Sequence, residues 1–280
     1  MEVDEKKTEL RDHLLGRSKE GLLSWADQRT AAELYGMSLS QVEEVALEAG
    51  LLPTRYQRNR KTLSIEDQLK LLRGTVAIIG CGGLGGYIVE ELARIGVGQL
   101  RAIDPDVFEE HNLNRQLMSS IAALGQPKVE AASARVAQIN PAVEVLAVRD
   151  RFSRENGRPF LGGVSVAVDA LDNIITRLEL AEVCSDLGVP LVHGSIAGWY
   201  GQIVTQLPGE STLQAIYGRC AEGVGVEKHL GNPSFTPAVV ASLQVAEVCK
   251  ILLGRGTSVT GAMLTINLLD MQFSKFKIKC

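Results

Sequence analysis

The sequence has few of the features that mark secreted, membrane-spanning or metal-stapled proteins. It has only five cysteines, widely spaced, and no Cys-x-x-Cys pair. This argues against a disulfide framework and a thiolate zinc site, so we expect a reducing, cytoplasmic setting. No apolar run approaches the roughly 18 residues needed to span a bilayer. The chain starts without a basic segment followed by an apolar one, so we expect no signal peptide and no membrane partner.

An excess of positive charge is also missing. There are 29 Lys and Arg residues against 33 Asp and Glu residues, which gives a net charge of −4. Such a chain has no general attraction for nucleic acids, so we expect no nucleic-acid partner, and any anion site must be local. The length of 280 residues suits one large domain with an appendage.

Residues 1–54 have a mostly helical pattern and are expected to form an N-terminal helical appendage. Ser40 and Glu43 have the spacing of a capping box ahead of an apolar stripe. Residues 31–52 have the look of a helix-turn-helix, but the second helix carries three glutamates and no base, which phosphates would repel. Packing of the appendage on the main domain or on a partner is the favoured interpretation.

From residue 74 onward, short apolar runs alternate with helical patterns. Such alternation predicts an α/β fold, a doubly wound, mostly parallel Rossmann-like sheet in a domain covering residues 55–280. Later strands are expected to be antiparallel, and the segment 208–233 has no clear period and is expected to be a functional loop. The expected strands cover residues 75–79, 99–103, 143–148, 165–168, 190–192, 200–206, 262–269 and 272–279, and the expected helices 84–95, 127–139, 174–187 and 238–253.

A glycine-rich loop follows the first strand of this pattern. Its sequence, Gly80-Cys81-Gly82-Gly83-Leu84-Gly85, satisfies G-x-G-x-x-G and precedes a helix, while Asp104 ends the next strand. Glycines let the backbone approach a phosphate, the helix N-terminus supplies N–H groups, and the carboxylate suits two ribose hydroxyls. We therefore expect Gly80, Gly82, Gly83, Gly85 and Asp104 to bind an adenine nucleotide. A turn needed only for close packing of helix on sheet is the alternative.

The segment after Asp104 favours phosphate chemistry over hydride transfer. Asp106, Asn112, Arg115 and Lys128 are expected near the carboxyl end of the sheet, where ligands of doubly wound folds bind. A phosphate-transfer enzyme needs such cations, whereas a dehydrogenase needs a nicotinamide pocket. The alternative for Lys128 is a solvated lysine in a first helical turn.

A candidate metal site follows the strand at residues 165–168. This strand leads to Asp169 and then to Asp172 and Asn173. A carboxylate placed there could hold Mg²⁺. Alternatively, Asp172 simply caps the next helix.

These residues together resemble the ThiF/MoeB/HesA family, the prokaryotic relatives of ubiquitin-activating enzymes. The similarity covers about residues 55–270, and its motifs follow the family's order with near-family spacing. The motifs are Arg55-Tyr56-Gln57-Arg58, Gly80–Gly85, Asp104-Pro105-Asp106, Asn112-Leu113-Asn114-Arg115-Gln116, Gly125-Gln126-Pro127-Lys128, Asp172-Asn173 with Arg177, and Ser242-Leu243-Gln244 before Glu247.

The resemblance implies ATP-dependent adenylation of a carrier protein. Its substrate would be the C-terminal Gly-Gly carboxylate of a small ubiquitin-like (β-grasp) sulfur carrier of the thiamin or molybdenum/tungsten cofactor type. Arg58 resembles an arginine that reaches the neighbouring subunit's site, which implies a homodimer. On the matching positions, Gly82 lies against the phosphates, Asp104 binds the ribose, Asn112, Arg115 and Lys128 contact the phosphates, and Asp172 binds Mg²⁺.

The sequence departs from the family pattern in two places. Thr212 and Ala215 stand near the first of two Cys-x-x-Cys pairs that hold structural zinc in many relatives, so we expect no zinc. Glu227 stands near the position of a nucleophilic cysteine found in some relatives. Cys220, with Arg219 beside it to lower its pKa, is a candidate nucleophile, and an incidental loop thiol is the alternative.

Three competing functions remain open at this point. One is an NAD(P)-dependent oxidoreductase that uses the same glycine loop. Another is adenylation of a small-molecule or tRNA-linked carboxylate, against which the acidic pI of 5.7 weighs weakly. The last is a non-catalytic carrier-binding module, against which the intact Arg115, Lys128 and Asp172 set argues.

Overall fold

The computed structural model describes residues 2–218 and 230–278 and is built around an eight-stranded sheet. The strand order is β10-β9-β8-β7-β6-β3-β4-β5. The five strands β3 to β7 pair parallel to one another, and β8, β9 and β10 are added antiparallel. The expected Rossmann-like sheet with antiparallel C-terminal strands is thus confirmed. The strands are β3 (Thr75–Ile79), β4 (Gln99–Ile103), β5 (Glu144–Val148), β6 (Val166–Asp169), β7 (Leu191–Ala197), β8 (Tyr200–Gln206), β9 (Ala262–Asn267) and β10 (Gln272–Lys277).

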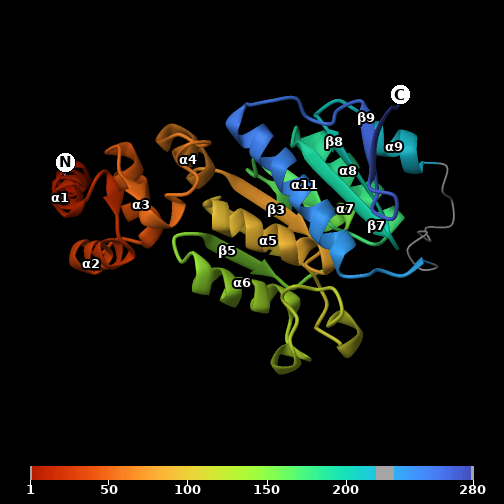
Figure 1. Cartoon of the computed structure of the whole chain (residues 1–280), viewed down its shortest axis with the longest axis horizontal. Helices are drawn as coiled ribbons and strands as arrows, with labels where there is room; N and C mark the ends of the chain where they lie inside the picture. Colours follow the sequence, from red (N-terminus) through yellow and green to blue (C-terminus); the bar gives the residue numbers. More distant parts are fainter. Residues whose placement is uncertain (1, 219–229, 279–280) are drawn as a thin grey trace.

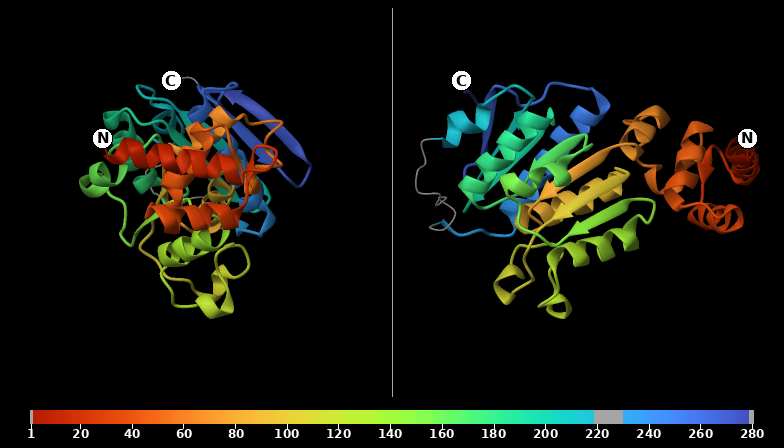
Figure 2. Two further views of the ribbon diagram at one scale, coloured as in Figure 1. Left: turned by 90° about the vertical axis from the view of Figure 1, so that its left-hand side faces the viewer. Right: turned by 180° about the vertical axis from the view of Figure 1, so that it is seen from behind.

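Helices cover both faces of this sheet, which explains why its central strand is apolar throughout. In β3, Val76 and Ile78 belong to the core on one face, and Ala77 and Ile79 to the core on the other. Alternate side chains of a strand point to opposite faces, so a strand covered on both sides carries a continuous apolar run. One face carries α5 (Gly83–Ile95), α6 (Lys128–Ile139) and α11 (Phe235–Leu253), and the other carries α7 (Arg154–Leu161), α8 (Ile174–Leu187) and α9 (Thr212–Tyr217) (Figures 1 and 2).

Helix α11 is long and apolar enough, by length and composition alone, to cross a membrane. Half of its apolar window is buried inside the protein, and Val240, Ala241, Val245 and Val248 belong to the core beneath it. Its apolar character is therefore explained by its position on the sheet.

The N-terminal helices form a small core of their own at one end of the molecule (Figure 1). The expected capping box at Ser40 and Glu43 is wrong by two residues. Ser38 caps the helix instead, and its N–H donates to the Gln41 side chain while its hydroxyl accepts the Gln41 N–H. Glu43 is buried. The elements are α1 (Glu2–Arg17), β1 (Leu22–Leu23), α2 (Trp25–Tyr35), α3 (Leu39–Glu48), β2 (Leu52–Pro53) and α4 (Ile65–Leu72).

A buried polar network joins these helices to the sheet domain. The Tyr56 hydroxyl lies 2.8 Å from Glu43 Oε1, and Asn140 donates to the same hydroxyl over 2.8 Å. Arg55 pairs with Glu43 and donates to Asn140 Oδ1 over 3.0 Å. Burial raises the pKa of Glu43, although Arg55 and Tyr56 act in the opposite direction. Arg55-Tyr56 therefore serves packing between the two parts of the chain.

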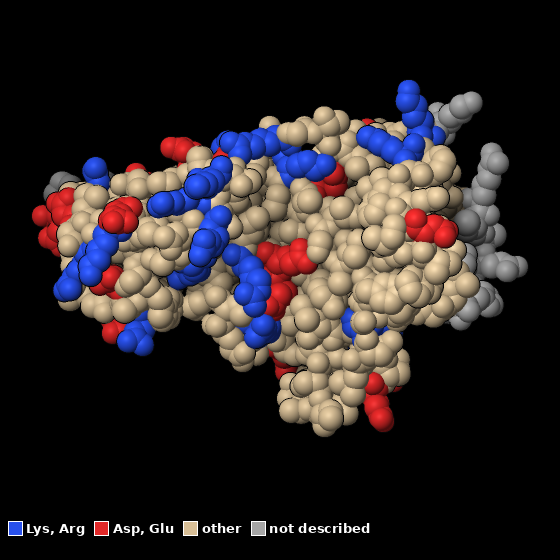
Figure 3. All heavy atoms as spheres, in the orientation of Figure 1, with Lys and Arg blue, Asp and Glu red and all other residues tan. Residues whose placement is uncertain are grey.

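On the face seen in Figure 3, basic side chains over the N-terminal helices are interspersed with acidic ones. Arg73, for example, pairs with both Glu44 and Glu48.

Candidate adenylation site

A cavity of about 470 Å³ lies at the carboxyl ends of the parallel strands. The chain runs outward from β3 to β4 and β5 on one side and continues with β6 and β7 on the other, so this is the switch point at which doubly wound folds bind ligands. Nine predicted site residues line the cavity: Gly80, Gly82, Gly83, Asp104, Asp106, Arg115, Lys128, Asp172 and Asn173. Side chains far apart in the sequence thus meet at one place.

The glycines of the loop divide between two roles. A Cβ on Gly85 would lie 1.8 Å from the Gly80 carbonyl oxygen, and a Cβ on Gly80, whose φ is +96°, would lie 2.7 Å from that of Ala170. Gly85 is therefore required by packing of helix on strand, and it does not line the cavity. Gly82 and Gly83 line the cavity, and a Cβ on either would meet only ordinary contacts, so the open space above them is available to a ligand.

Asp104 is held rigidly at the end of β4. Its Oδ2 accepts the Cys81 N–H over 2.7 Å, and its Oδ1 accepts the Asp106 N–H over 2.8 Å. Burial raises the pKa of Asp104 above its ordinary value, and this effect outweighs Lys128 and the two N–H groups, which lower the pKa. A fixed acceptor beside the glycine loop is the arrangement expected for binding ribose hydroxyls.

Lys128 and Arg115 bring positive charge to the cavity. Lys128 is buried and its Nζ lies 3.0 Å from Asp106 Oδ2, so it is not a solvated surface lysine. Arg115 Nη1 donates to the His111 carbonyl over 2.9 Å and to Asn114 Oδ1 over 2.8 Å. These contacts orient the guanidinium while its remaining donors can reach a bound anion.

Two amide side chains at the cavity have unpaired acceptor atoms. Gln116 Oε1 and Asn232 Oδ1 are buried and have no hydrogen-bond partner among the described residues. Buried polar atoms are nearly always paired, so these two favour an additional polar group at this place. Asn112 does not line the cavity. Its Oδ1 accepts the Glu109 N–H over 3.0 Å, so it supports the turn that precedes Arg115.

Asp172, and not Asp169, is placed to hold a metal ion. Asp172 is exposed at the cavity, whereas Asp169 is fully buried with its Oδ2 bonded to Arg177 and His193. The helix-cap alternative for Asp172 is wrong, because Asn173 Oδ1 accepts the Thr176 N–H over 3.0 Å and caps α8. No group of three metal-ligating side chains occurs in residues 2–218 and 230–278. A single carboxylate fits Mg²⁺ that is shared with nucleotide phosphates.

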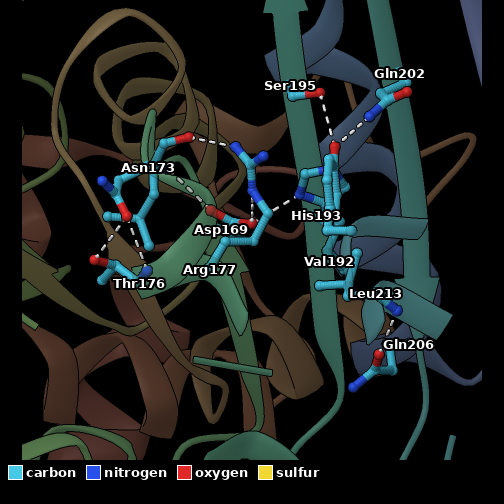
Figure 4. Close-up of polar contacts among 12 residues, drawn as sticks. Asp169, Asn173, Thr176, Arg177, Val192, His193, Ser195, Gln202, Gln206 and Leu213 are labelled. Carbon is cyan, nitrogen blue, oxygen red and sulfur yellow. Dashed lines mark hydrogen bonds and ion pairs between the residues drawn. The ribbon is translucent and has the colours of Figure 1, made fainter. Parts of the chain in front are cut away.

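Several residues at the site had no role in the sequence-based prediction. Arg177, Ser195, Arg151 and Asn232 also line the cavity, and Arg177 was noted only as part of a motif. Figure 4 shows the Arg177 side chain, which comes from the first turns of α8, directed at Asp169. Arg177 lies four residues after Asn173, about one helical turn, and this spacing was the sequence signal that both side chains lie on the same side of α8.

Besides Gly85 and Asn112, one further predicted site residue among the described residues lies away from the cavity. Arg58 is exposed and does not line the cavity. Cys220 lies outside the described residues, as do Arg219 and Glu227. Thr212 and Ala215, near the expected zinc position, belong to α9.

Comparison with curated proteins finds relatives named as adenylyltransferases or as an activating enzyme. The SAMP-activating enzyme E1 of Haloferax volcanii is 37% identical over 78% of this chain and 83% of that protein. The sulfur carrier protein adenylyltransferase of Thermus thermophilus is 33% identical over 76% of this chain and 82% of its own. The adenylyltransferase and sulfurtransferase MOCS3 of Mus musculus is 32% identical, and the match covers 50% of that longer protein.

Comparison with solved structures shows the fold, and the family comparison shows the family. The crystal structure of E. coli MccB with ATP superimposes with a TM-score of 0.66 over 80% of this chain and 71% of that one, at 18% identity, which shows the shared fold. Residues 56–280 match the ThiF family. The chain therefore belongs to the ThiF family, whose members found here include adenylyltransferases of sulfur carriers.

Proposed function

We propose that this protein uses ATP to adenylate the C-terminal Gly-Gly carboxylate of a small ubiquitin-like sulfur carrier. The observation that carries the proposal is the meeting of Arg115, Lys128 and Asp172 at one cavity beside the glycine loop. Its relatives named as adenylyltransferases and as an activating enzyme support the same chemistry.

In this reaction, a carboxylate oxygen of the carrier attacks the α-phosphorus of ATP. The bond between that phosphorus and the bridging oxygen breaks, pyrophosphate leaves, and an acyl adenylate forms. Attack of one anion on another is opposed by repulsion, so fixed positive charges are needed where negative charge develops. Lys128 and Arg115 supply such charges, and Asp104 binds the ribose so that the α-phosphorus is presented to the carrier tail.

Asp172 is the residue that would hold Mg²⁺ together with phosphate oxygens. The bound ion would offset phosphate charge and help the departure of pyrophosphate. The chain's own part is to keep the Asp172 carboxylate exposed at the cavity while Asp169 and Asn173 are engaged in hydrogen bonds.

The remaining expectations are also proposals. Arg58 would act in the site of a second copy, which makes a homodimer part of the proposal. Residues 1–54 would form the appendage and 55–280 the adenylation domain, and the protein would work in the cytoplasm without structural zinc. Cys220 would be a nucleophile only if the carrier is passed on as a thioester or persulfide.

Carrier-dependent exchange of labelled pyrophosphate into ATP tests the reaction. The probes are the β-grasp proteins ending in Gly-Gly that the same organism encodes, each compared with a version lacking the last glycine. Exchange with the intact tail and none with the shortened tail is expected. Calorimetric binding of NAD but not of ATP would contradict the proposal and favour an oxidoreductase.

A further inference from the structure

A row of hydrogen-bonded polar side chains, buried except at its Gln202 end, crosses three strands of the sheet and ends at Asp169, three residues before the candidate metal residue Asp172. It joins Gln202 on β8, Tyr217 at the end of α9, His193 on β7 and Asp169 at the end of β6 (Figure 4). Strands β8, β7 and β6 are neighbours in the sheet, which brings these residues into one row. We call this row the Asp169–Tyr217 network.

The chemistry of these groups fixes the direction of the hydrogen bonds. Asp169 Oδ2 can only accept when ionised, so His193 donates from Nδ1, 2.7 Å away. His193 Nε2 is then the acceptor, and the Tyr217 hydroxyl donates to it over 3.0 Å. The Tyr217 oxygen in turn accepts from Gln202 Nε2. Each member therefore fixes the orientation of the next.

The network ends on the backbone beside Asp172. Asp169 Oδ1 accepts the Leu171 N–H over 2.9 Å, and Arg177 Nη2 donates to the Leu171 carbonyl over 2.6 Å. Arg177 Nε also donates to Asp169 Oδ2 over 2.9 Å. Both polar groups of Leu171, the residue before Asp172, are thus held by one buried ion pair.

The backbone carbonyl of Asp169 and the side chain of Asn173, the residue after Asp172, are fixed as well. Gln244 Nε2 donates to the Asp169 carbonyl over 2.9 Å, and Asn173 caps α8. Asp172 is therefore an exposed residue placed between two immobilised neighbours. Tyr217 and His193 do not line the cavity, so they act on Asp172 indirectly, through Asp169 and through Arg177, whose guanidinium carbon lies 4.9 Å from the centre of the Tyr217 ring.

We propose that Tyr217 and His193 are positioning residues that set the Asp172 carboxylate for a divalent cation bound with the nucleotide. This inference rests on the proposed function of Asp172. Outer hydrogen-bond partners of metal ligands typically affect metal affinity about 10–100-fold. The same bonds order the backbone of residues 170–173 before any ligand arrives.

The test uses the full-length protein with Mn²⁺ as the probe and α,β-methylene ATP as the nucleotide. Mn²⁺ binding to the nucleotide complex is followed by electron paramagnetic resonance, and exchange of the Leu171 amide by hydrogen–deuterium exchange. Tyr217→Phe removes one oxygen atom and His193→Leu removes both ring nitrogens. Gln202→Met, at the accessible end of the network, is a milder change should His193→Leu fail to fold.

The matched control is Thr205→Val. Thr205 is also buried on β8 and its hydroxyl lies 2.6 Å from Glu247 Oε2, away from Asp169. We expect Tyr217→Phe to weaken Mn²⁺ binding about tenfold and to speed Leu171 exchange, while Thr205→Val leaves both near the wild-type values. Unchanged Mn²⁺ affinity in Tyr217→Phe, or an equal loss in Thr205→Val, would overturn the inference.

These measurements are independent of the carrier. Absence of carrier adenylation together with a Tyr217-dependent Mn²⁺ site would count against the proposed function and leave the positioning role standing. Normal adenylation with a Tyr217-independent Mn²⁺ site would leave the proposed function standing and count against the positioning role.

Discussion

Lys128 Nζ lies 3.0 Å from Asp106 Oδ2, and the two side chains differ sharply in exposure. The lysine side chain is 8% exposed, whereas that of Asp106 is 58% exposed. The cation is thus fixed at the cavity by a partner that itself remains open to water. A phosphate oxygen can take the place of the Asp106 carboxylate without the lysine having to be desolvated again.

Lys128→Met is therefore expected to impair adenylation with little effect on folding. We expect carrier-dependent pyrophosphate exchange to fall at least about a hundredfold, the scale of one lost transition-state donor. Lys7→Met, a change of an exposed lysine on α1, is the control and should leave exchange unchanged. Equal rates for both variants would exclude Lys128 from the site.

Arg115→Ala tests the second cation. Its guanidinium is oriented by His111 and Asn114 toward the same cavity, so its loss should also lower exchange by at least about a hundredfold. Arg29→Ala serves as the comparison, because Arg29 is exposed on α2 and pairs only loosely with Glu33. Near-normal exchange in Arg115→Ala would remove this arginine from the mechanism.

Glu43→Ala tests the junction between the N-terminal helices and the sheet domain. Removal of this buried carboxylate leaves Arg55 without its ion-pair partner and the Tyr56 hydroxyl without one of its contacts. The free energy of unfolding should fall by about 3 kcal/mol in chemical denaturation. Glu33→Ala, on the exposed face of α2, is expected to change stability little. A small effect of Glu43→Ala would show that the junction does not depend on this pair.

The buried His193 gives stability a definite pH dependence. Burial, assisted by Arg177, lowers the pKa of His193 against the pull of Asp169. Burial alone would raise the pKa of Asp169, but Arg177 and His193 together bring it below its ordinary value, so Asp169 stays ionised here. Burial raises the pKa of Tyr217, which stays neutral.

The direction of the pH effect follows from proton uptake by the unfolded chain. Below about pH 6.5 the unfolded chain binds a proton that folded His193 does not. The free energy of unfolding therefore falls as the pH drops below that value, by up to about 1.4 kcal/mol per pH unit from this group. Denaturation of the wild type and His193→Gln between pH 7.5 and 5.5 measures this contribution. An identical slope in both proteins would show that His193 does not supply it.

Most of the sheet and nine of the residues that line the cavity could be predicted from local patterns and motifs. The run at residues 75–79 lies between Gly74 and Gly80 and is apolar after Thr75, so it predicts a buried strand, and the structure has β3 at these residues. Helix α7 was missed because Arg154–Leu161 is polar and contains Gly157 and Pro159. Helix α9 was missed because its six residues lie in a segment that lacks a visible period.

The residues that support the site could not be predicted, because their roles depend on contacts across strands. His193 is a buried histidine at the site's edge, and its partner Tyr217 lies 24 residues further along the chain. Lys128 and Asp106 were both expected at the site, but their contact across 22 residues of sequence was not. Only the packing of helices and loops on the folded sheet brings such pairs together, whereas the glycine loop is encoded in consecutive residues.

Transfer of label from ATP to the carrier tests adenylation most directly. The wild-type protein is incubated with an intact Gly-Gly carrier and with ATP labelled either at the α-phosphorus or at the γ-phosphorus. Adenylation predicts that α-label appears on the carrier as an acid-isolated adenylate and that γ-label leaves as pyrophosphate. A carrier that carries neither label, or one that carries the γ-label, would contradict the assignment of this site.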